Sequence, residues 1–192
     1  MPNHTTNQLT VVHKKDGSKV MHIDDPKLRG LLKRFSLDKV IPMPEQLKGT
    51  TSPSDSPNWY DWSVDNWGTK WDVYPSYGYD ANEDETIDLF STDGKFFTAW
   101  APPIPVIRKL QNDFPEYEFI LEYVDEGWFF AGTLMADGTD LCLTEHKEII
   151  KYALRLGATT EEEIEEMQAW ACASKPRKQN ENRKNYMGRI AT

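Results

Sequence analysis

The sequence predicts an α+β protein in which one antiparallel sheet has helices packed on one face. Three observations lead to this expectation. Runs of β-branched and aromatic residues occur in pairs around Asp-Gly and Glu-Gly turns, a pattern typical of β-hairpins. Between the pairs, apolar residues repeat at intervals of three and four, which predicts amphipathic helices. The chain has 192 residues, 39% of them hydrophobic, enough for one compact domain with a core.

The first third of the chain predicts a hairpin, a helix and a short strand. Residues 9–12 and 19–23 flank an Asp-Gly turn and form the expected hairpin. Asp25 before Pro26 is a typical helix start. The apolar face of that helix consists of Leu28, Leu31, Leu32 and Phe35. Residues 40–41 predict a brief strand that ends at the prolines following it, because proline cannot donate to a strand ladder.

The next segment contains the densest aromatic feature of the chain. Residues 48–57 are rich in turn formers and predict a surface loop, and Ser56-Pro57 predicts a helix start. Residues 59–71 hold four of the seven tryptophans, and Gly68 is the expected end of the helix. Helical spacing places Tyr60, Val64, Trp67 and Trp71 on one face and Trp59 and Trp62 on another. One aromatic face can therefore join the core, while the other needs a partner.

The rest of the chain predicts two more hairpins, an edge strand and three helices. In order, these are strands 87–90 and 95–100, a helix at 105–114, strands 118–124 and 128–135, and an edge strand at 141–143. Thr144 caps a helix that ends at Gly157, and Thr160 with Glu163 forms a capping box for a last helix. The expected organisation is a domain at 1–143, a helical hairpin packed on it at 144–173, and a flexible basic tail at 174–192.

The charge of the chain is unevenly distributed. The formal charge is −9, from 22 basic and 31 acidic residues. From Lys175 onward there are six basic residues and one acidic residue, so this tail carries +5 and residues 1–174 carry −14. An acidic body disfavours nucleic acid and membrane headgroups, and it favours basic partners or small ligands. Cys142 and Cys172 lack metal-site spacing and predict free thiols in a reducing compartment.

Several motifs resemble those of a known family. They are Pro-Asn-His at 2–4 with Asn7, Ile-Pro-Met-Pro at 41–44, the tryptophan-rich 58–62 and 66–71, Phe-Thr-Ala-Trp-Ala-Pro-Pro at 97–103, and Phe-Ala-Gly at 130–132. Together they resemble the YubB-type ferredoxin-like family, which consists largely of uncharacterised proteins of bacteriophages and conjugative plasmids. The likeness covers roughly residues 1–135 and implies a ferredoxin-like fold encoded by a mobile element. It supplies no activity and no catalytic residue, and the chain departs from the pattern at 14–18 and beyond Leu143.

The tryptophan block allows two interpretations. As core residues, its indoles would close over the sheet, since each buries about 150–250 Å². As a recognition surface, they would resemble protein-binding hot spots, which are enriched in Trp and Tyr, with polar neighbours supplying specificity. The candidate binding residues are Trp59, Tyr60, Asp61, Trp62, Asp65, Asn66, Trp67, Lys70 and Trp71.

Other candidate sites have less support in the sequence. Asp61 and Asp65 lie one helical turn apart, a spacing that suits acid–base chemistry or a divalent ion, but no third ligand is near in sequence. His13 and His22 would share a face of the first hairpin, whereas zinc sites usually recruit three or four ligands. Phosphate loops, nucleophile elbows and metalloprotease motifs are absent from the sequence.

The sequence therefore predicts a protein that is not an enzyme and that has no catalytic residue, no metal site and no cofactor. We expect an accessory protein of a phage or plasmid, located in the cytoplasm of the bacterial host. It would bind a host protein and inhibit an antiviral defence system, with no membrane partner. The alternative is a ferredoxin-like module that binds nucleic acid or a nucleotide through its sheet face and its basic tail. A small-molecule pocket beneath the tryptophan helix is a further possibility.

Overall fold

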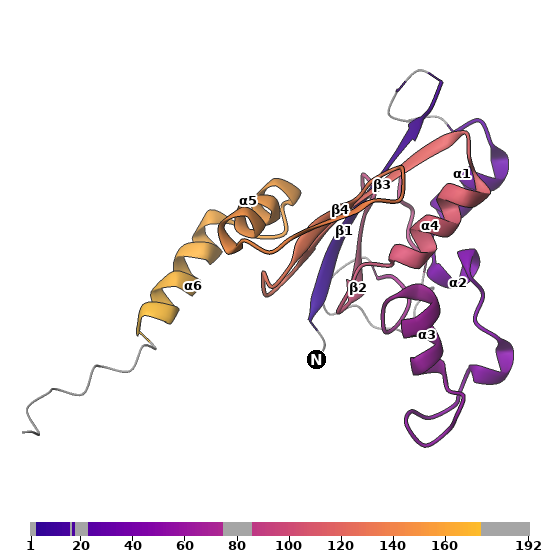
Figure 1. Cartoon of the computed structure of the whole chain (residues 1–192), viewed down its shortest axis with the longest axis horizontal. Coiled ribbons are helices and arrows are strands. Elements are labelled where there is room, and N and C mark those ends of the chain that lie inside the picture. The colour runs from indigo at the N-terminus through magenta and orange to yellow at the C-terminus, as the bar shows by residue number, and fades with distance from the viewer. Residues whose placement is uncertain (1–2, 16, 18–22, 75–85, 174–192) are drawn as a thin grey trace, which may run out of the picture. The chain divides into compact units, whose positions relative to one another are not determined.

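The computed structural model describes residues 3–15, 17, 23–74 and 86–173, and within them five strands form one antiparallel sheet (Figure 1). The strand order is β2-β1-β3-β4-β5. These strands are β1 (His4–His13), β2 (Lys95–Ala99), β3 (Tyr117–Asp125), β4 (Ala131–Leu134) and β5 (Asp140–Leu143). The predicted hairpin of β3 with β4 and the predicted edge strand β5 are confirmed.

The central strand β1 is antiparallel to both of its neighbours. Gln8, for example, lies opposite Lys95 on one side and opposite Glu122 on the other. Strands β2 and β3 therefore run in the same direction on either side of β1, and α4 (Ile104–Asp113) connects them. This split βαβ unit is typical of ferredoxin-like folds, and the predicted α+β class is confirmed.

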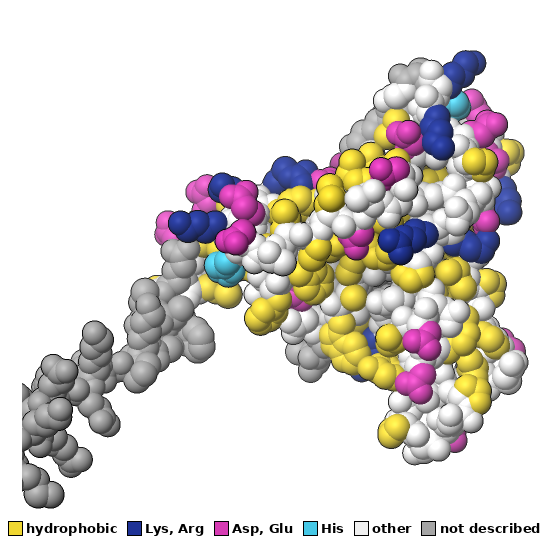
Figure 2. Space-filling view, in the orientation of Figure 1, with side chains coloured by type: hydrophobic (Ala, Val, Ile, Leu, Met, Phe, Trp, Pro, Cys, Tyr) yellow, Lys and Arg dark blue, Asp and Glu magenta, His cyan; other side chains and the backbone are white. Residues whose placement is uncertain are grey.

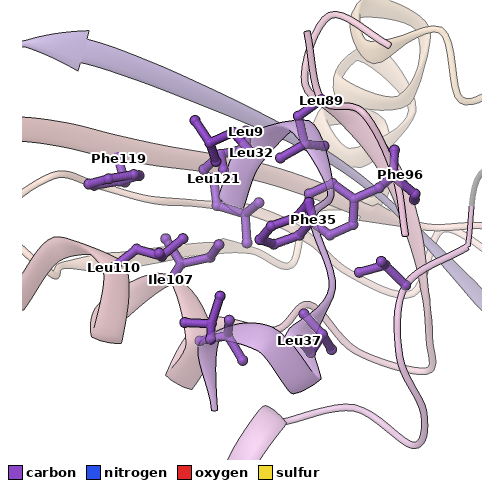
Figure 3. Close-up of a cluster of buried hydrophobic side chains, with 14 of the residues drawn as sticks. Leu9, Leu32, Phe35, Leu37, Leu89, Phe96, Ile107, Leu110, Phe119 and Leu121 are labelled. Atoms are coloured by element: carbon purple, nitrogen blue, oxygen red, sulfur yellow. The ribbon is translucent and has the colours of Figure 1, made fainter. Parts of the chain in front are cut away.

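One face of the sheet carries the main core. Side chains alternate along a strand, so Phe119 and Leu121 of β3 point to the same face as Leu9 of β1. Helices α1 (Pro26–Lys33) and α4 lie on this face, and Leu28 and Ile107 are buried there. Figure 3 shows ten labelled side chains of this cluster from the sheet, the helices and the connecting segments. Asp25 caps α1 through the amides of Lys27 and Leu28, as predicted.

The opposite face of the sheet is covered by α5 (His146–Leu156), which contacts β3 and β4. Tyr152 donates a hydrogen bond to the Gly132 carbonyl at 2.8 Å and lies 3.2 Å from a Glu122 oxygen. Arg155 forms an ion pair with Glu122. Because Glu122 follows Leu121 in β3, its side chain points away from the main core. The helices of this fold are therefore not confined to one face of the sheet.

Contacts divide the chain between Ala158 and Thr159 into two compact units, and the organisation expected from the sequence, with a boundary at 143–144, stays a prediction. The first unit therefore includes α5. In the second unit, α6 (Glu161–Ala173) begins with the predicted capping box. The Thr160 amide donates to Glu163 at 3.0 Å, and the Glu163 amide donates to the Thr160 hydroxyl at 3.2 Å. The predicted tail, 174–192, lies outside the described residues.

Two predicted strands are wrong. Residues 37–40 form a short helix, α2 (Leu37–Val40), and not a strand at 40–41. Residues 87–90 form a turn in which only Ile87 has a bridge partner, Phe35. In both places a distant residue decides the local structure: the Asp72 carboxylate accepts from the Leu37 amide, and Phe35 pairs with Ile87. The second strand of the first predicted hairpin, 19–23, lies outside the described residues except for Ile23.

The remaining helices are η1 (Glu45–Leu47) and α3 (Trp59–Trp67), and α3 contacts α4. Together with α2 they occupy the chain between α1 and β2. In Figure 1, α1, α2, α3 and α4 lie on the same side of the sheet. Among the described residues, no helix combines the length and the apolar character that a membrane span requires.

Candidate functional site

Helix α3 carries the tryptophan block, and its ends follow from local chemistry. Asn58 is the N-cap: its side-chain oxygen accepts from the Asp61 amide at 3.0 Å, and its amide nitrogen donates to the Asp61 carboxylate at 2.7 Å. The helix therefore begins at Trp59, after the predicted start at Ser56-Pro57, and it ends at Gly68 as predicted.

The face of α3 that joins the core includes members of both predicted aromatic faces, Trp67 and Trp62. Ser63 and Trp67 are buried, whereas Val64 is 39% exposed. The Trp67 indole nitrogen donates to the Ile41 carbonyl at 2.8 Å, and Trp62 meets Trp67 edge to face at 5.3 Å. The core therefore takes the stripe through Ser63 and Trp67. The other tryptophans of the block remain only partly buried.

An open cleft of about 630 Å³ lies between α2, the segments on either side of η1, α3 and the segment that follows α3. We call it the α3 cleft. Its lining residues are Ser36, Asp38, Lys39, Met43, Lys48, Gly49, Thr50, Trp59, Trp67, Lys70, Trp71, Asp72 and Thr86. A volume of roughly 300–1,000 Å³ is usual for sites that bind small molecules. Three indoles and Met43 make its apolar surface.

Hydrogen bonds fix the walls of the α3 cleft. The Thr50 hydroxyl accepts from the Trp59 amide at 2.9 Å and donates to the Leu47 carbonyl at 2.6 Å, which ties the loop after η1 to the start of α3. The Ser63 hydroxyl donates to the Lys70 carbonyl at 2.7 Å, which holds the segment after α3 against the helix. The lining side chains therefore project from a fixed backbone.

Asp72 forms the inner wall of the cleft and is almost fully enclosed. Its carboxylate accepts from the Ser36 hydroxyl at 2.7 Å and from the amides of Leu37, Asp38 and Val73 at 2.6, 3.1 and 2.7 Å. Burial raises the pKa of Asp72, and these hydrogen bonds act in the opposite direction. The carboxylate thus caps α2, and its lone pairs are occupied within the protein.

A continuous row of aromatic side chains borders the cleft. We call it the aromatic rim, and it consists of Trp59, Tyr60, Trp100, Lys70 and Trp71. Tyr60 meets Trp59 edge to face at 5.8 Å and Trp100 at 6.0 Å. The Lys70 ammonium nitrogen lies 4.7 Å from the ring centroid of Trp71 and 4.8 Å from that of Trp100. This ammonium therefore has cation–π contacts with two indoles at once.

Trp100 combines exposure with an unfavourable backbone conformation. Its side chain is 40% exposed, and its φ is +72°, in the left-handed region that bulky residues rarely adopt. Its amide donates to the Asn3 carbonyl at 2.8 Å, which helps to hold this conformation. Left-handed backbone costs a residue with a side chain roughly 1–2 kcal/mol. The strained conformation therefore occurs at a residue whose indole is partly exposed on the surface.

The charge of the α3 cleft differs from that of the whole chain. Lys39, Lys48 and Lys70 line it together with two aspartates, of which Asp72 is enclosed. Lys48 pairs with Glu45 at 3.0 Å and lies 3.9 Å from Asp38. The Glu45 hydrogen bond, with the nearby charges of Asp38 and Glu45, raises the pKa of Lys48, so this side chain stays cationic. Beyond the Lys48 ion pairs, the positive charge of the lining comes from Lys39 and Lys70, in a chain whose total charge is −9.

The structure separates the nine predicted site residues into groups. Trp59, Trp67, Lys70 and Trp71 line the cleft, and Tyr60 belongs to the rim beside it. The others lie outside the cleft lining: Trp62 packs on the core, Asp61 binds Asn58, Asp65 is exposed, and Asn66 donates to the Trp62 carbonyl. Figure 2 shows exposed hydrophobic side chains with acidic ones among them in the region of α3.

Sequence reasoning missed several residues that the fold brings to this site. Trp100 comes from the end of β2, and Lys39, Met43 and Lys48 come from α2 and the segment around η1. For Trp100 a signal was present, because it stands between a strand and a pair of prolines, where the chain must turn. For the lysines no local pattern distinguishes them from other surface lysines.

The other candidate sites gain no support from the described residues. No group of three or more His, Cys, Asp or Glu side chains there is placed to hold a metal ion. His13 meets Tyr117 edge to face at 5.3 Å, while His22 lies outside the described residues. Of the aromatic residues in and beside the strands, which the nucleic-acid alternative would use to stack on bases, Phe96 and Trp128 are buried, Phe97 stacks on Tyr74, and Phe129 is 76% exposed.

The comparisons with known proteins gave one match. A family model described as "Ferredoxin-like domain in Api92-like protein" matches residues 77–172, which is half of the chain. The match extends past Leu143 through α5 and nearly all of α6, a region that the resemblance seen in the sequence did not cover. The searches of curated proteins and of solved structures found no match. The ferredoxin-like part of that resemblance is thereby supported, while the YubB type and the mobile-element origin stay predictions.

Proposed function

The chain belongs to the family of Api92-like proteins with a ferredoxin-like domain, and from this starting point we propose that it is a non-enzymatic binding protein. Its partner is a protein, which it engages through the α3 cleft and the aromatic rim. A ferredoxin-like fold by itself implies no particular function, so the proposal depends on the chemistry of this site. The observation that carries it is the aromatic rim, a row of four partly exposed rings, two of which contact the Lys70 ammonium.

The partly exposed indole of Trp100, at a strained backbone position, favours a role in binding a partner over a role in packing the core. Binding hot spots are enriched in Trp, Tyr and Arg, and they lie where aromatic anchors can be desolvated by a partner. Trp100 adds little to the main core, from which it is separate, yet the fold holds it in a left-handed conformation. Outliers of this kind cluster at functional sites because selection there acts on something other than stability.

The lining of the cleft offers no arrangement for ordinary acid–base or nucleophilic catalysis. Its described residues include neither histidine nor cysteine. The Ser36 hydroxyl donates to Asp72, whose carboxylate is already occupied by backbone amides. A nucleophile, a base and a stabilising group would have to meet in one place, and these side chains do not supply the set.

A bacterial host protein is the proposed partner, and inhibition of an antiviral defence system is the proposed consequence. Both follow from the resemblance of the sequence motifs to proteins of phages and plasmids. The bacterial cytoplasm is the proposed location, in line with the two cysteines expected as free thiols. Of these, Cys142 is an exposed free thiol in the structure.

Site-specific photo-cross-linking in bacterial cells tests the proposed site. The photoreactive residue benzoylphenylalanine would replace Tyr60 in one chain and Leu141 in another. Leu141 is a matched control because it is apolar, 53% exposed and located in edge strand β5, outside the cleft lining. We expect a protein to be cross-linked from position 60 and not from position 141.

A second substitution makes the test specific. Adding Trp100→Gly to the chain with the probe at position 60 should remove the cross-linked band, since Trp loss at a hot spot typically costs 2 kcal/mol or more of binding free energy. Equal cross-linking from positions 60 and 141, or a band that survives the loss of Trp100, would contradict a partner site at the rim.

Nucleotide binding is the second candidate function, because lysines and flat indoles in one cleft also suit a base and its phosphate. The test is titration of AMP and of single-stranded nucleic acid while indole fluorescence is followed. Phosphate contacts predict an affinity that falls steeply with salt, and the salt slope should decrease when Lys39 and Lys48 are replaced.

A further inference from the structure

We propose that the α3 cleft binds an acidic peptide segment that carries an apolar or aromatic anchor residue. This inference deepens the proposed function, on which it rests, by naming the chemistry of the partner. The anchor side chain would enter the cleft among Trp59, Trp67 and Trp71. Carboxylates beside the anchor would meet Lys39, Lys48 and Lys70.

The charge of the cleft favours an acidic partner, whereas the composition of the chain favours a basic one. The body of the chain carries −14, which by itself favours a basic partner. At the cleft, however, three lysines line the walls with two aspartates, of which Asp72 is enclosed and turned to α2. Lys48 is already paired with Glu45 and Asp38, so Lys39 and Lys70 supply the positive charge for a partner. Charge complementarity acts over short distances in salt, with a screening length of about 8 Å at physiological ionic strength. The local positive charge therefore decides what docks here.

The apolar part of the cleft has the size and chemistry for a single anchor side chain with its backbone. Trp67 forms part of the lining while its indole nitrogen is bound to Ile41, so it offers ring surface and not a hydrogen-bond donor. Met43 lies in the same lining, and methionine adapts its shape to aromatic and branched side chains. The polar groups lie around these apolar side chains, as in peptide sites with one anchor.

Lys70 is the residue that links the cleft to the rim. Its ammonium is held over two indoles, at 4.7 and 4.8 Å from their centroids. Those contacts restrict its side chain before binding, so less conformational freedom is lost when a carboxylate pairs with it. Trp100 is 40% exposed and Trp71 is partly exposed, so both indoles retain surface for the peptide chain. Lys70 thus serves as a positioned cation for a segment that crosses from the cleft onto Trp100.

The same features favour a peptide over a nucleotide. Phosphate sites commonly use free backbone amides at a helix start or a glycine-rich turn. Here the amides of Leu37 and Asp38 at the start of α2 are already occupied by Asp72. The lysines act as point charges, which pair with a carboxylate as well as with a phosphate. The rim also extends the contact surface beyond the cleft, which suits an extended segment.

Selection from a display library of random 12-residue peptides tests this inference. The bait would be the full chain, with counter-selection on Lys39→Glu/Lys48→Glu. We expect enriched peptides to contain an aromatic or large aliphatic residue flanked by Asp or Glu. In fluorescence anisotropy, the double variant should bind such a peptide about 5- to 30-fold more weakly, and Trp59→Ala at least about 30-fold more weakly.

A matched control separates local charge from total charge. Lys147→Glu makes the charge change of one of the two substitutions, half that of the double variant, on an exposed residue of α5 and should leave the affinity unchanged. Enrichment of basic or uncharged peptides would overturn the inference, as would equal weakening by Lys147→Glu. Failure to enrich any peptide, or tighter binding of AMP than of every peptide with competition between them, would overturn it as well.

Different results would contradict the proposed function and the acidic-peptide inference. If a protein is cross-linked from position 60 while the enriched peptides are not acidic, the proposed function holds and the acidic segment is wrong. If no protein is cross-linked at the rim, the proposed function itself fails. Circular dichroism and urea unfolding of each variant establish that it is folded before its binding is compared.

Discussion

At Trp100 we expect glycine to give a more stable protein than alanine, which reverses the usual order of these two residues. At an ordinary position, glycine makes a protein less stable than alanine does, by about 0.4–1 kcal/mol, because it has more freedom in the unfolded chain. Trp100 has a φ of +72°, where alanine is strained by roughly 1–2 kcal/mol and glycine is not. Trp100→Gly should therefore be more stable than Trp100→Ala by about 0.5–1 kcal/mol.

The difference in stability between these two variants measures the cost of the left-handed backbone conformation at position 100. Both lose the contacts of the indole with Lys70 and Tyr60, so that loss cancels. Urea unfolding followed by far-ultraviolet circular dichroism is the suitable assay, because fluorescence changes when an indole is removed. A control pair, Asp65→Gly and Asp65→Ala, at an exposed position of α3 should give the opposite order, with alanine more stable by about 0.8–1 kcal/mol. If Trp100→Ala were as stable as Trp100→Gly, the strained conformation would be refuted.

Three further predictions concern the structure that supports the site. A Cβ on Gly94 would lie 2.1 Å from the Leu9 carbonyl oxygen, so Gly94→Ala should lower the free energy of unfolding by about 2–4 kcal/mol. Gly138→Ala, where a Cβ would meet open space, should lower it by about 1–2 kcal/mol. The midpoints of urea unfolding of the two variants test this difference. Tyr152→Phe should cost about 1–2 kcal/mol by the same measurement, because it removes hydrogen bonds that join α5 to the sheet. Burial raises the pKa of Asp72 above 3.8, so the folded chain binds this proton more tightly than the unfolded chain. The contribution of that proton to stability is complete below pH 3.8, the ordinary pKa, and is lost as the pH rises through the folded pKa. The free energy of unfolding of the parent should therefore exceed that of Asp72→Asn by less as the pH rises over this range. A difference that grows with pH would contradict a raised pKa for Asp72.

Local signals predicted most of the elements of this fold. The Asp25 cap, the Thr160 capping box and the turn before β4 each depend on residues within a few positions, and all three are present. The errors occur where distant residues intervene. Asp72 caps α2 from more than thirty positions away, and Phe35 takes Ile87 as its bridge partner. No pattern within either segment indicates those partners.

The same distinction applies to the candidate site. The density of tryptophan in residues 59–71 identified the segment, because clustered indoles are rare and serve either packing or binding. Which indoles pack and which stay on the surface depends on the rotation of α3 about its axis, which the spacing of residues leaves open. Trp100 and the cleft lysines join the site only through folding. The sequence therefore predicted the segment, and the tertiary structure defines the surface.

The most direct test of a binding surface at the aromatic rim is an indole ¹H–¹⁵N spectrum recorded while an enriched acidic peptide is added. The account predicts that the Nε1 signals of Trp59, Trp71 and Trp100 shift with a common dissociation constant. Trp128, which is only 6% exposed and lies beside His146 of α5, should stay in place. A shift of Trp128 with Trp59, Trp71 and Trp100 unchanged would contradict the assignment of the site to the rim and the α3 cleft.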